Sequence, residues 1–461
     1  MLAEIKTLNF KSLRYLQFVL AIAIVTCVSD GQLFAQFGGG NGLFLTGGRP
    51  VGGVQVDPNG VLQNETVNLT DDIKQQLKRG LANVDADISK PGTRMISLKA
   101  LEKKMVECKN SGQPFPAEVR YFAGLQRVEY VILDKENNDV ILAGPGEGFE
   151  TDEKGNVVGK KSGSPVVRLE DFLVAMRHVN NARQGYGISV SIDPTEQGVR
   201  NVQRLMQNYS VRSFNKNSAR ELEEACGPQK ITLTGVPTDS RFSRVLVAAD
   251  YKMKRLAMGL EESPEFLPSL LAMAQAKNAR FNKMTPRFWM EADYEPVAVS
   301  EDKTVWKLNG QGVCAKTEEE FMAADGSRKA TKPNKFAKKW ADEMTENYEK
   351  LSATEPVFRE LRNMMDLSVV AAIIEGEGLM KSAGLSAPAI KGNDTIAIPK
   401  WNVPKTVPTQ CSFARMSRSL MVTTSGGVTI NSWAVAKNTK VDSKLTLDTA
   451  NSTDRWWWNA N

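Results

Sequence analysis

Hydrophobic residues recur every three or four positions along much of the chain, which is the spacing of one face of an α-helix. Leu98, Leu101 and Met105 fall on one such stripe. Ser97, immediately before them, is a residue type preferred at a helix N-cap. The spacing predicts helices over residues 70–84, after Ser97, after Pro116, over 169–180, after Asp193, over 218–226, 241–257, 264–277 and 336–351, and after Pro356.

Two of these helices carry further information. Asp193 and Pro194 are residue types favoured at the N-cap and the first helical position, so we expect a helix to begin there. In the helix after Pro356, the segment Leu367–Ile374 is apolar on every side. A helix of that kind must be enclosed by protein, so we expect it to pack into the main core.

Other segments alternate hydrophobic and polar residues or form short apolar runs, as β-strands do. These segments predict strands over residues 54–56, 61–62, 128–133, 140–143, 188–192 and 231–235, a hairpin over 149–158, strands within 287–316, and a strand pair at 420–423 and 428–430. This succession of helices and strands predicts an α+β fold, with mixed sheets and packed helices.

The composition changes along the chain and divides it into five parts. Residues 1–35 form a candidate leader, 36–68 a Gly-rich leader segment followed by a hairpin, and 69–285 an α+β domain. Residues 286–378 add strands and a helical pair packed on the core, and 379–461 form a Pro- and Thr-rich tail. We therefore expect two subdomains plus a loosely ordered C-terminal tail that docks through its three tryptophans, Trp456, Trp457 and Trp458.

The leader has the composition of a secretory signal peptide. Three basic residues (Lys6, Lys11 and Arg14) precede an apolar run over 18–25, and Ala35 is a small residue suited to a cleavage site. The run is shorter than the roughly 20 apolar residues of a membrane span. The pattern predicts export to the periplasm, the cell surface or the medium, with no transmembrane segment after cleavage; an uncleaved leader acting as an anchor is the alternative.

Composition and charge argue against a nucleic-acid binder. Hydrophobic residues make up 41% and charged residues 24% of the chain, as in a globular protein with a substantial core. The formal net charge of +6 is small for 461 residues, whereas nucleic-acid binders concentrate positive charge on one face. The densest basic cluster, residues 328–339, is explained by a solvated loop that leads into the outer face of a helix.

Four cysteines follow the leader: Cys108, Cys226, Cys314 and Cys411. An even number in an exported protein permits disulfides, and four cysteines allow three full pairings. Free buried thiols explain them equally well. Their wide spacing argues against a zinc site, which would need close pairs.

Catalytic schemes that need histidine depend on a single residue. His178 is the only histidine of the chain, and its helical position points away from the apolar stripe, so we expect it at the surface. Ser213 with Lys216 and Ser300 with Lys303 have the Ser-x-x-Lys spacing of some acyl-enzyme hydrolases. No complete set of partner motifs accompanies them, so chance is the better explanation.

Two other patterns also have plain structural explanations. Gly144–Gly148 follows a strand, but no helix is predicted after it, so a tight turn is favoured over a phosphate-binding loop. Acidic pairs and runs (Glu375 with Glu377, Asp71 with Asp72, and Glu318–Glu320) could serve a glycosidase, yet solvated helix ends and loops explain them. We therefore assign no catalytic, cofactor-binding or metal-binding residue and no cofactor.

Several sequence blocks arrive in a recognisable order. They are the segments 121–131, 141–148, 189–195 and 249–256. This pattern resembles an uncharacterised family of exported planctomycete proteins, classed as a domain of unknown function, over roughly residues 115–375. The resemblance implies an exported bacterial protein and supplies no functional residues. A shorter stretch, 163–173, resembles the segment of PDZ domains that enters their peptide-binding helix.

These observations favour an exported, non-catalytic binding or structural protein whose partner is an unknown envelope protein or polymer. The first alternative is an exported glycosidase- or peptidase-like hydrolase with paired carboxylates, which would show two acids in one cleft and a raised pKa on one of them. The second alternative is a PDZ-like module that binds an extended peptide along an open sheet edge.

Overall fold

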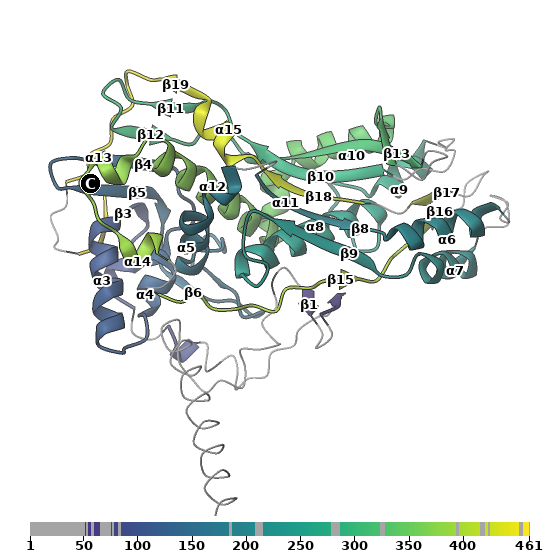
Figure 1. The fold of residues 1–461 in the computed structure, drawn as a ribbon, viewed down its shortest axis with the longest axis horizontal. Coiled ribbons are helices and arrows are strands. Elements are labelled where there is room, and N and C mark those ends of the chain that lie inside the picture. The colour runs from purple at the N-terminus through teal and green to yellow at the C-terminus, as the bar shows by residue number, and fades with distance from the viewer. Residues whose placement is uncertain are drawn as a thin grey trace, which may run out of the picture.

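In a computed structural model, the chain forms helices packed on mixed sheets, which confirms the α+β prediction (Figure 1). The structure describes residues 51, 54–56, 60–64, 75, 78–81, 84–183, 187–207, 215–277, 286–322, 328–392, 396–414, 420–422, 425–450 and 455–460. The predicted leader, most of the predicted helix 70–84, and Ser213 lie outside the described residues.

One seven-stranded sheet, here called sheet I, has the order β19-β11-β12-β4-β5-β3-β20. Its strands are β3 (Gly92–Ser97), β4 (Tyr130–Asp134), β5 (Asp139–Gly146), β11 (Val297–Val299), β12 (Val305–Lys307), β19 (Thr439–Val441) and β20 (Trp457–Asn459). All neighbours are antiparallel except β11 and β19. The hairpin β4–β5 at its centre confirms the two strands predicted around residues 134–139.

A second seven-stranded sheet, sheet II, has the order β14-β13-β10-β18-β8-β9-β15. Its strands are β8 (Ile188–Asp193), β9 (Gln229–Thr234), β10 (Pro286–Asp293), β13 (Gly312–Met322), β14 (Arg328–Thr331), β15 (Thr406–Val407) and β18 (Ser425–Ile430). Strands β10 and β18 run parallel, and the other neighbours are antiparallel. Sheet II therefore combines strands from the middle of the chain with strands from the tail.

The predicted strands at 420–423 and 428–430 are present but do not pair with each other. β17 (Leu420–Val422) pairs with β16 (Ser412–Ala414), whereas β18 lies between β10 and β8. Two adjacent glycines allow this close approach. A Cβ on Gly426 would lie 1.5 Å from the carbonyl oxygen of Phe288, and one on Gly427 would lie 1.8 Å from that of Val190.

Two short hairpins complete the strands, and both were predicted. They are β1 (Val54–Val56) with β2 (Leu62–Asn64), and β6 (Phe149–Thr151) with β7 (Val157–Gly159). The segment Gly144–Gly148 is not the tight turn that the sequence favours, because β5 stays paired with β3 as far as Gly146.

The remaining helices mostly follow the predicted stripes. They are α3 (Leu98–Asn110), α4 (Ala117–Arg120), α5 (Leu169–His178), α6 (Glu196–Gln207), α7 (Lys216–Cys226), α8 (Arg241–Met258), α9 (Leu270–Ala276), α10 (Lys335–Glu346), α11 (Tyr348–Thr354), α12 (Pro356–Gly376), α13 (Leu379–Ser382), α14 (Pro388–Lys391) and α15 (Ser432–Lys437). The single helix predicted over 336–351 is divided at Asn347 into α10 and α11.

The predicted N-cap at Asp193 is wrong. Asp193 is the last residue of β8, where pairing with Lys230 of β9 keeps its backbone extended. The helix begins at Glu196, and the hydroxyl of Thr195 accepts the Gly198 N–H at 3.0 Å. The apolar stripe of α6 is only half-buried and packs against Ala219 and Leu222 of α7.

Helix α12 lies between the two sheets (Figure 1). It contacts β4 of sheet I, β13 of sheet II, and helices α5, α8, α11 and α15. Every residue of Leu367–Ile374 is at most 3% exposed, which confirms that this apolar segment is enclosed by protein.

The tail docks through its tryptophans, as predicted. Trp456, Trp457 and Trp458 are all buried, and the Arg94 guanidinium lies 4.6 Å from the centre of the Trp457 ring. The described part of the tail also supplies β15 and β18 to sheet II and β19 and β20 to sheet I. More of the tail is thus built into the sheets than its Pro- and Thr-rich composition indicates.

We predict that Gly426→Ala destabilises the protein by about 3 kcal/mol or more, because the added methyl group would overlap the backbone of β10. Gly112→Ala is the matched control. Gly112 also has a positive φ, but a Cβ there meets nothing within 4 Å, so its expected cost is about 1 kcal/mol. Chemical denaturation measures both, and equal costs would contradict the tight insertion of β18.

Candidate functional site

A pocket of about 440 Å³ lies where α7, the junction of α8 and α9, and β16 meet. Asn215 caps the N-terminus of α7 here, because its side chain accepts the N–H groups of Asn217 and Ser218. Helix α8 ends at Gly259 in a left-handed conformation, with a φ of 66°. These two helix ends and the segment that leads into β16 form the walls.

The pocket combines apolar walls with positive charge. Ala219, Met258, Leu271 and Phe413 supply apolar surface. Lys216 and Arg220 are exposed cations on α7, and Arg220 also forms a solvent-exposed ion pair with Glu224 at 3.7 Å. Among the described residues that line the pocket, Glu223 is the one with an acidic side chain. Its Oε1 accepts the N–H of Cys411 at 2.7 Å, so this carboxylate holds the wall in place.

Cys411 lines the same pocket and is a poor nucleophile there. Burial is the main cause that raises the pKa of its thiol, to about 12, and the negative charges of Glu223 and Cys226 add to the effect. Since the thiolate is the reactive form, the raised pKa makes Cys411 slow to react near neutral pH.

Buried charges lie elsewhere, around α8 and α12. The guanidinium of Arg241 on α8 bonds to the carboxylates of Asp171 on α5 and Glu360 on α12. The three side chains are 3%, 1% and 9% exposed. Burial raises the pKa of Asp171 to about 7, with Arg241 opposing the shift.

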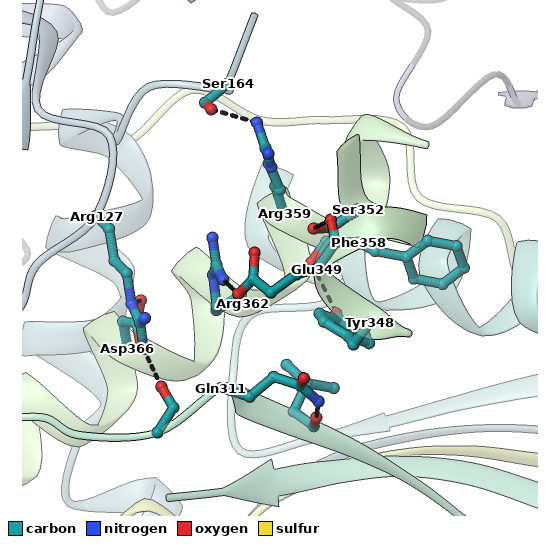
Figure 2. A network of polar contacts seen from close by, with 12 residues as sticks. Arg127, Ser164, Gln311, Tyr348, Glu349, Ser352, Phe358, Arg359, Arg362 and Asp366 are labelled. Carbon is teal, nitrogen blue, oxygen red and sulfur yellow. Dashed lines mark hydrogen bonds and ion pairs between the residues drawn. The ribbon is translucent and has the colours of Figure 1, made fainter. Parts of the chain in front are cut away.

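A second network joins α12 to both sheets (Figure 2). Arg127, just before β4, donates two bonds to Asp366 of α12, at 2.8 and 3.2 Å. The hydroxyl of Tyr294, just after β10, donates to the same carboxylate at 2.6 Å. Nearby, Arg362 pairs with Glu349 and Arg359 donates to Ser164, so polar contacts tie the first half of α12 to its surroundings.

These buried acids do not have the geometry of a hydrolase. Asp171 and Glu360 share a cation and one has a raised pKa, which is the signature expected of paired catalytic carboxylates. Both are nevertheless shielded from solvent, and no described pocket residue belongs to this group. The network is suited to holding three helices together.

His178 is half-buried, where the sequence predicts an exposed side chain. Burial, with the nearby charge of Arg177, lowers its pKa. Its Nδ1 lies 3.2 Å from the side-chain amide of Asn181. Among the described residues, no cysteine or serine side chain forms a hydrogen bond with the His178 ring.

The other sequence candidates have structural contacts. The hydroxyl of Ser300 donates to Asp302 within the predicted turn and accepts the N–H of Val305. Lys303 meets Ser300 through its backbone, where its N–H donates to the Ser300 carbonyl at 3.0 Å. Glu147 of the Gly-rich segment accepts bonds from Ser162 and Gln126. Glu375 pairs with Lys391, and Glu318 pairs with Arg287. Asp71 and Asp72 lie outside the described residues.

Helix α5, which begins within the stretch that resembles PDZ domains, is enclosed. It contacts α4, α8, α12 and α14, and Leu169 to Met176 are all buried. A PDZ-like groove would need an open sheet edge beside this helix.

Among the described residues, no group of three or more His, Cys, Asp or Glu side chains is placed to hold a metal ion. In that same part of the chain, no helix combines the length and apolar character needed to cross a bilayer.

Comparison with known proteins locates one domain of unknown function. Residues 190–270 match the family model described as "Protein of unknown function (DUF1598)". The match runs from β8 through α8, and so it includes the α7 and α8 walls of the pocket. The sequence resembles a domain of unknown function over roughly residues 115–375. The family model matches a shorter part of that range, residues 190–270.

One further similarity covers 106 residues, or 23% of the chain. Over this stretch the chain is 31% identical to a protein named "Probable polyketide synthase 45" from Dictyostelium discoideum. The chain spans 3% of that protein's length, so the similarity concerns a small segment of it. No solved structure matches the chain.

We predict that Arg241→Met costs about 3 kcal/mol of stability at pH 8, because it leaves two carboxylates buried without their cation. The cost should be smaller at pH 5 than at pH 8. Arg241 opposes the rise in the pKa of Asp171, which is about 7 with Arg241 present, so in the variant this pKa lies higher still. As the pH falls towards about 7, the folded variant therefore takes up a proton on Asp171 before the wild type does, and this uptake stabilises the variant relative to the wild type.

Urea denaturation at pH 8 and pH 5 measures this effect. Arg200→Met is the control, because its ion pair with Glu196 is solvent-exposed, and we expect a change within about 0.5 kcal/mol. An Arg241→Met cost that is equal at both pH values, or greater at pH 5, would contradict the role given to the buried network.

Proposed function

We propose that the chain is an exported, non-catalytic binding protein, and that its α7 pocket takes a small ligand with an acidic group and an apolar part. The observation that carries the proposal is the pairing of two exposed cations, Lys216 and Arg220, with an apolar wall in a hollow of about 440 Å³. Small-ligand pockets are commonly about 300–1,000 Å³ and combine apolar walls with a few polar groups that orient the ligand.

The positions of the polar groups support the ligand class. Lys216 and Arg220 are four residues apart on α7 and so lie on one face of the helix. An anionic group on the ligand would meet this face, and its apolar part would contact Leu271 and Phe413. Glu223 bonds to the Cys411 backbone, which places its carboxylate at the wall.

The absence of free paired acids at the pocket favours binding over hydrolysis. A glycosidase needs two carboxylates flanking the substrate, about 5–10 Å apart. Among the described pocket residues, Glu223 is the sole carboxylate, and its pocket neighbour Cys411 has a raised pKa. Export is supported by the basic and apolar pattern of residues 1–35.

We predict that octanoate binds the protein and that octylamine, of the same chain length and opposite charge, does not. Lys216→Ala with Arg220→Ala should weaken octanoate binding about 5- to 10-fold, since two charge contacts in solvent are removed. Isothermal titration calorimetry at low ionic strength measures the affinities.

The double variant Lys103→Ala with Lys109→Ala is the matched control, because these lysines are exposed on α3. It should leave octanoate binding unchanged. Equal binding of octanoate and octylamine, or an equal loss in both double variants, would contradict the proposed pocket chemistry. Turnover of a glycan or peptide substrate by the purified protein would contradict the non-catalytic role.

We also predict that the native protein begins at Gln36, because the small side chain of Ala35 suits signal-peptidase cleavage. Intact-mass analysis of protein isolated from its own cells tests this. A mass that includes Met1 would support the membrane-anchor alternative in place of a released protein.

A further inference from the structure

The last turn of α7 lies against the chain segment that leads into β16. Two hydrogen bonds join them: Cys411 N–H to Glu223 Oε1 at 2.7 Å, and Thr409 Oγ1 to the Gly227 carbonyl at 2.6 Å. Cys226 is in this turn, between Glu223 and Gly227 in sequence. Residues 409–411 therefore run alongside the helix end that carries Cys226.

Cys411 packs on an apolar cluster that includes one face of α7. Leu222 is buried in a cluster with Ala219, and Cys411 and Phe413 pack against it. Cys226 follows Leu222 by four residues, so both lie on the same face of α7. Helical spacing thus places Cys226 on the face of α7 against which Cys411 packs.

Electrostatics agrees with this placement. After burial and the charge of Glu223, the charge of Cys226 is a further cause that raises the pKa of Cys411. The other two cysteines are on different elements, Cys108 on α3 and Cys314 on β13. Among the four described cysteines, this interaction marks Cys226 and Cys411 as neighbours.

We propose that Cys226 and Cys411 form a disulfide that fastens the segment 409–413 to α7 and so fixes one wall of the pocket. Neither cysteine is disulfide-bonded in this structure. On oxidation, each thiol loses its proton, an S–S bond forms, and the two electrons and two protons pass to a disulfide donor, which is reduced to two thiols. The proposal relies on the proposed export only for the oxidant, because exported compartments favour disulfides.

The disulfide would close a long covalent loop in the chain. The bond would join residues 226 and 411 around β9, α8 and most of sheet II. Cross-linking distant residues stabilises the folded state, chiefly by restricting the unfolded chain. Phe413, two residues after Cys411, would then have a fixed position in the pocket wall.

The test uses the purified full chain with Cys27→Ser, so that four thiols remain. The reduced, folded protein is incubated with oxidised glutathione, denatured, alkylated with iodoacetamide, and digested for mass spectrometry. We expect a cross-linked peptide pair that contains Cys226 and Cys411, with Cys108 and Cys314 alkylated. Alkylation of both Cys226 and Cys411 without prior reduction, or a different pairing, would overturn the proposal.

Several cysteine-to-serine variants are compared, so that the test still decides the pairing if one substitution impairs folding. The double variant Cys108→Ser with Cys314→Ser should retain the cross-link, whereas Cys226→Ser and Cys411→Ser should each abolish it. Reductant should lower the Tm of the oxidised protein by roughly 5 °C and leave that of Cys226→Ser unchanged. Because no ligand takes part, failure of octanoate binding would leave this result untouched, and failure of the cross-link would leave the pocket chemistry untouched.

Discussion

Helix α12 passes between the two sheets, and its buried carboxylates bond to arginines from other elements. Glu360 reaches Arg241 on α8, and Asp366 reaches Arg127 beside sheet I. Tyr294, at the end of a strand of sheet II, also bonds to Asp366. A buried carboxylate is costly without a partner, so these bonds strongly disfavour any arrangement in which one sheet shifts relative to α12. The position of both sheets depends on this helix.

The buried charged groups and the pocket lie in different parts of the molecule. The charged groups that most resemble a catalytic set are enclosed in the core and are used to hold helices together. The pocket lies instead at α7 and β16, in walls supplied mainly by the domain of unknown function. Ligand contact at that edge would leave the α12 network undisturbed. The proposed binding role places the ligand at this accessible edge, away from the buried charges.

Local pattern was enough to predict much of the fold. The stripes after Ser97 and after Pro356, and the hairpin β4–β5, depend on residues close in sequence, and all are present. The position of β18 in sheet II was not predicted, since it depends on strands about 140 to 240 residues earlier in the chain. The same applies to the bond between Arg241 and Asp171, 70 residues apart, and to the pocket. Asp193 shows the converse, because tertiary strand pairing overrode a strong local capping pattern.

Native-state hydrogen exchange, followed by mass spectrometry over a denaturant series, tests the central role of α12 most directly. If α12 holds the sheets together, peptides from Leu361–Ile374, from β5 and from β8 should exchange through one shared opening with the same free energy. Exchange of α12 at a distinctly lower free energy than both sheets, or separate openings of the two sheets while α12 stays protected, would contradict the account.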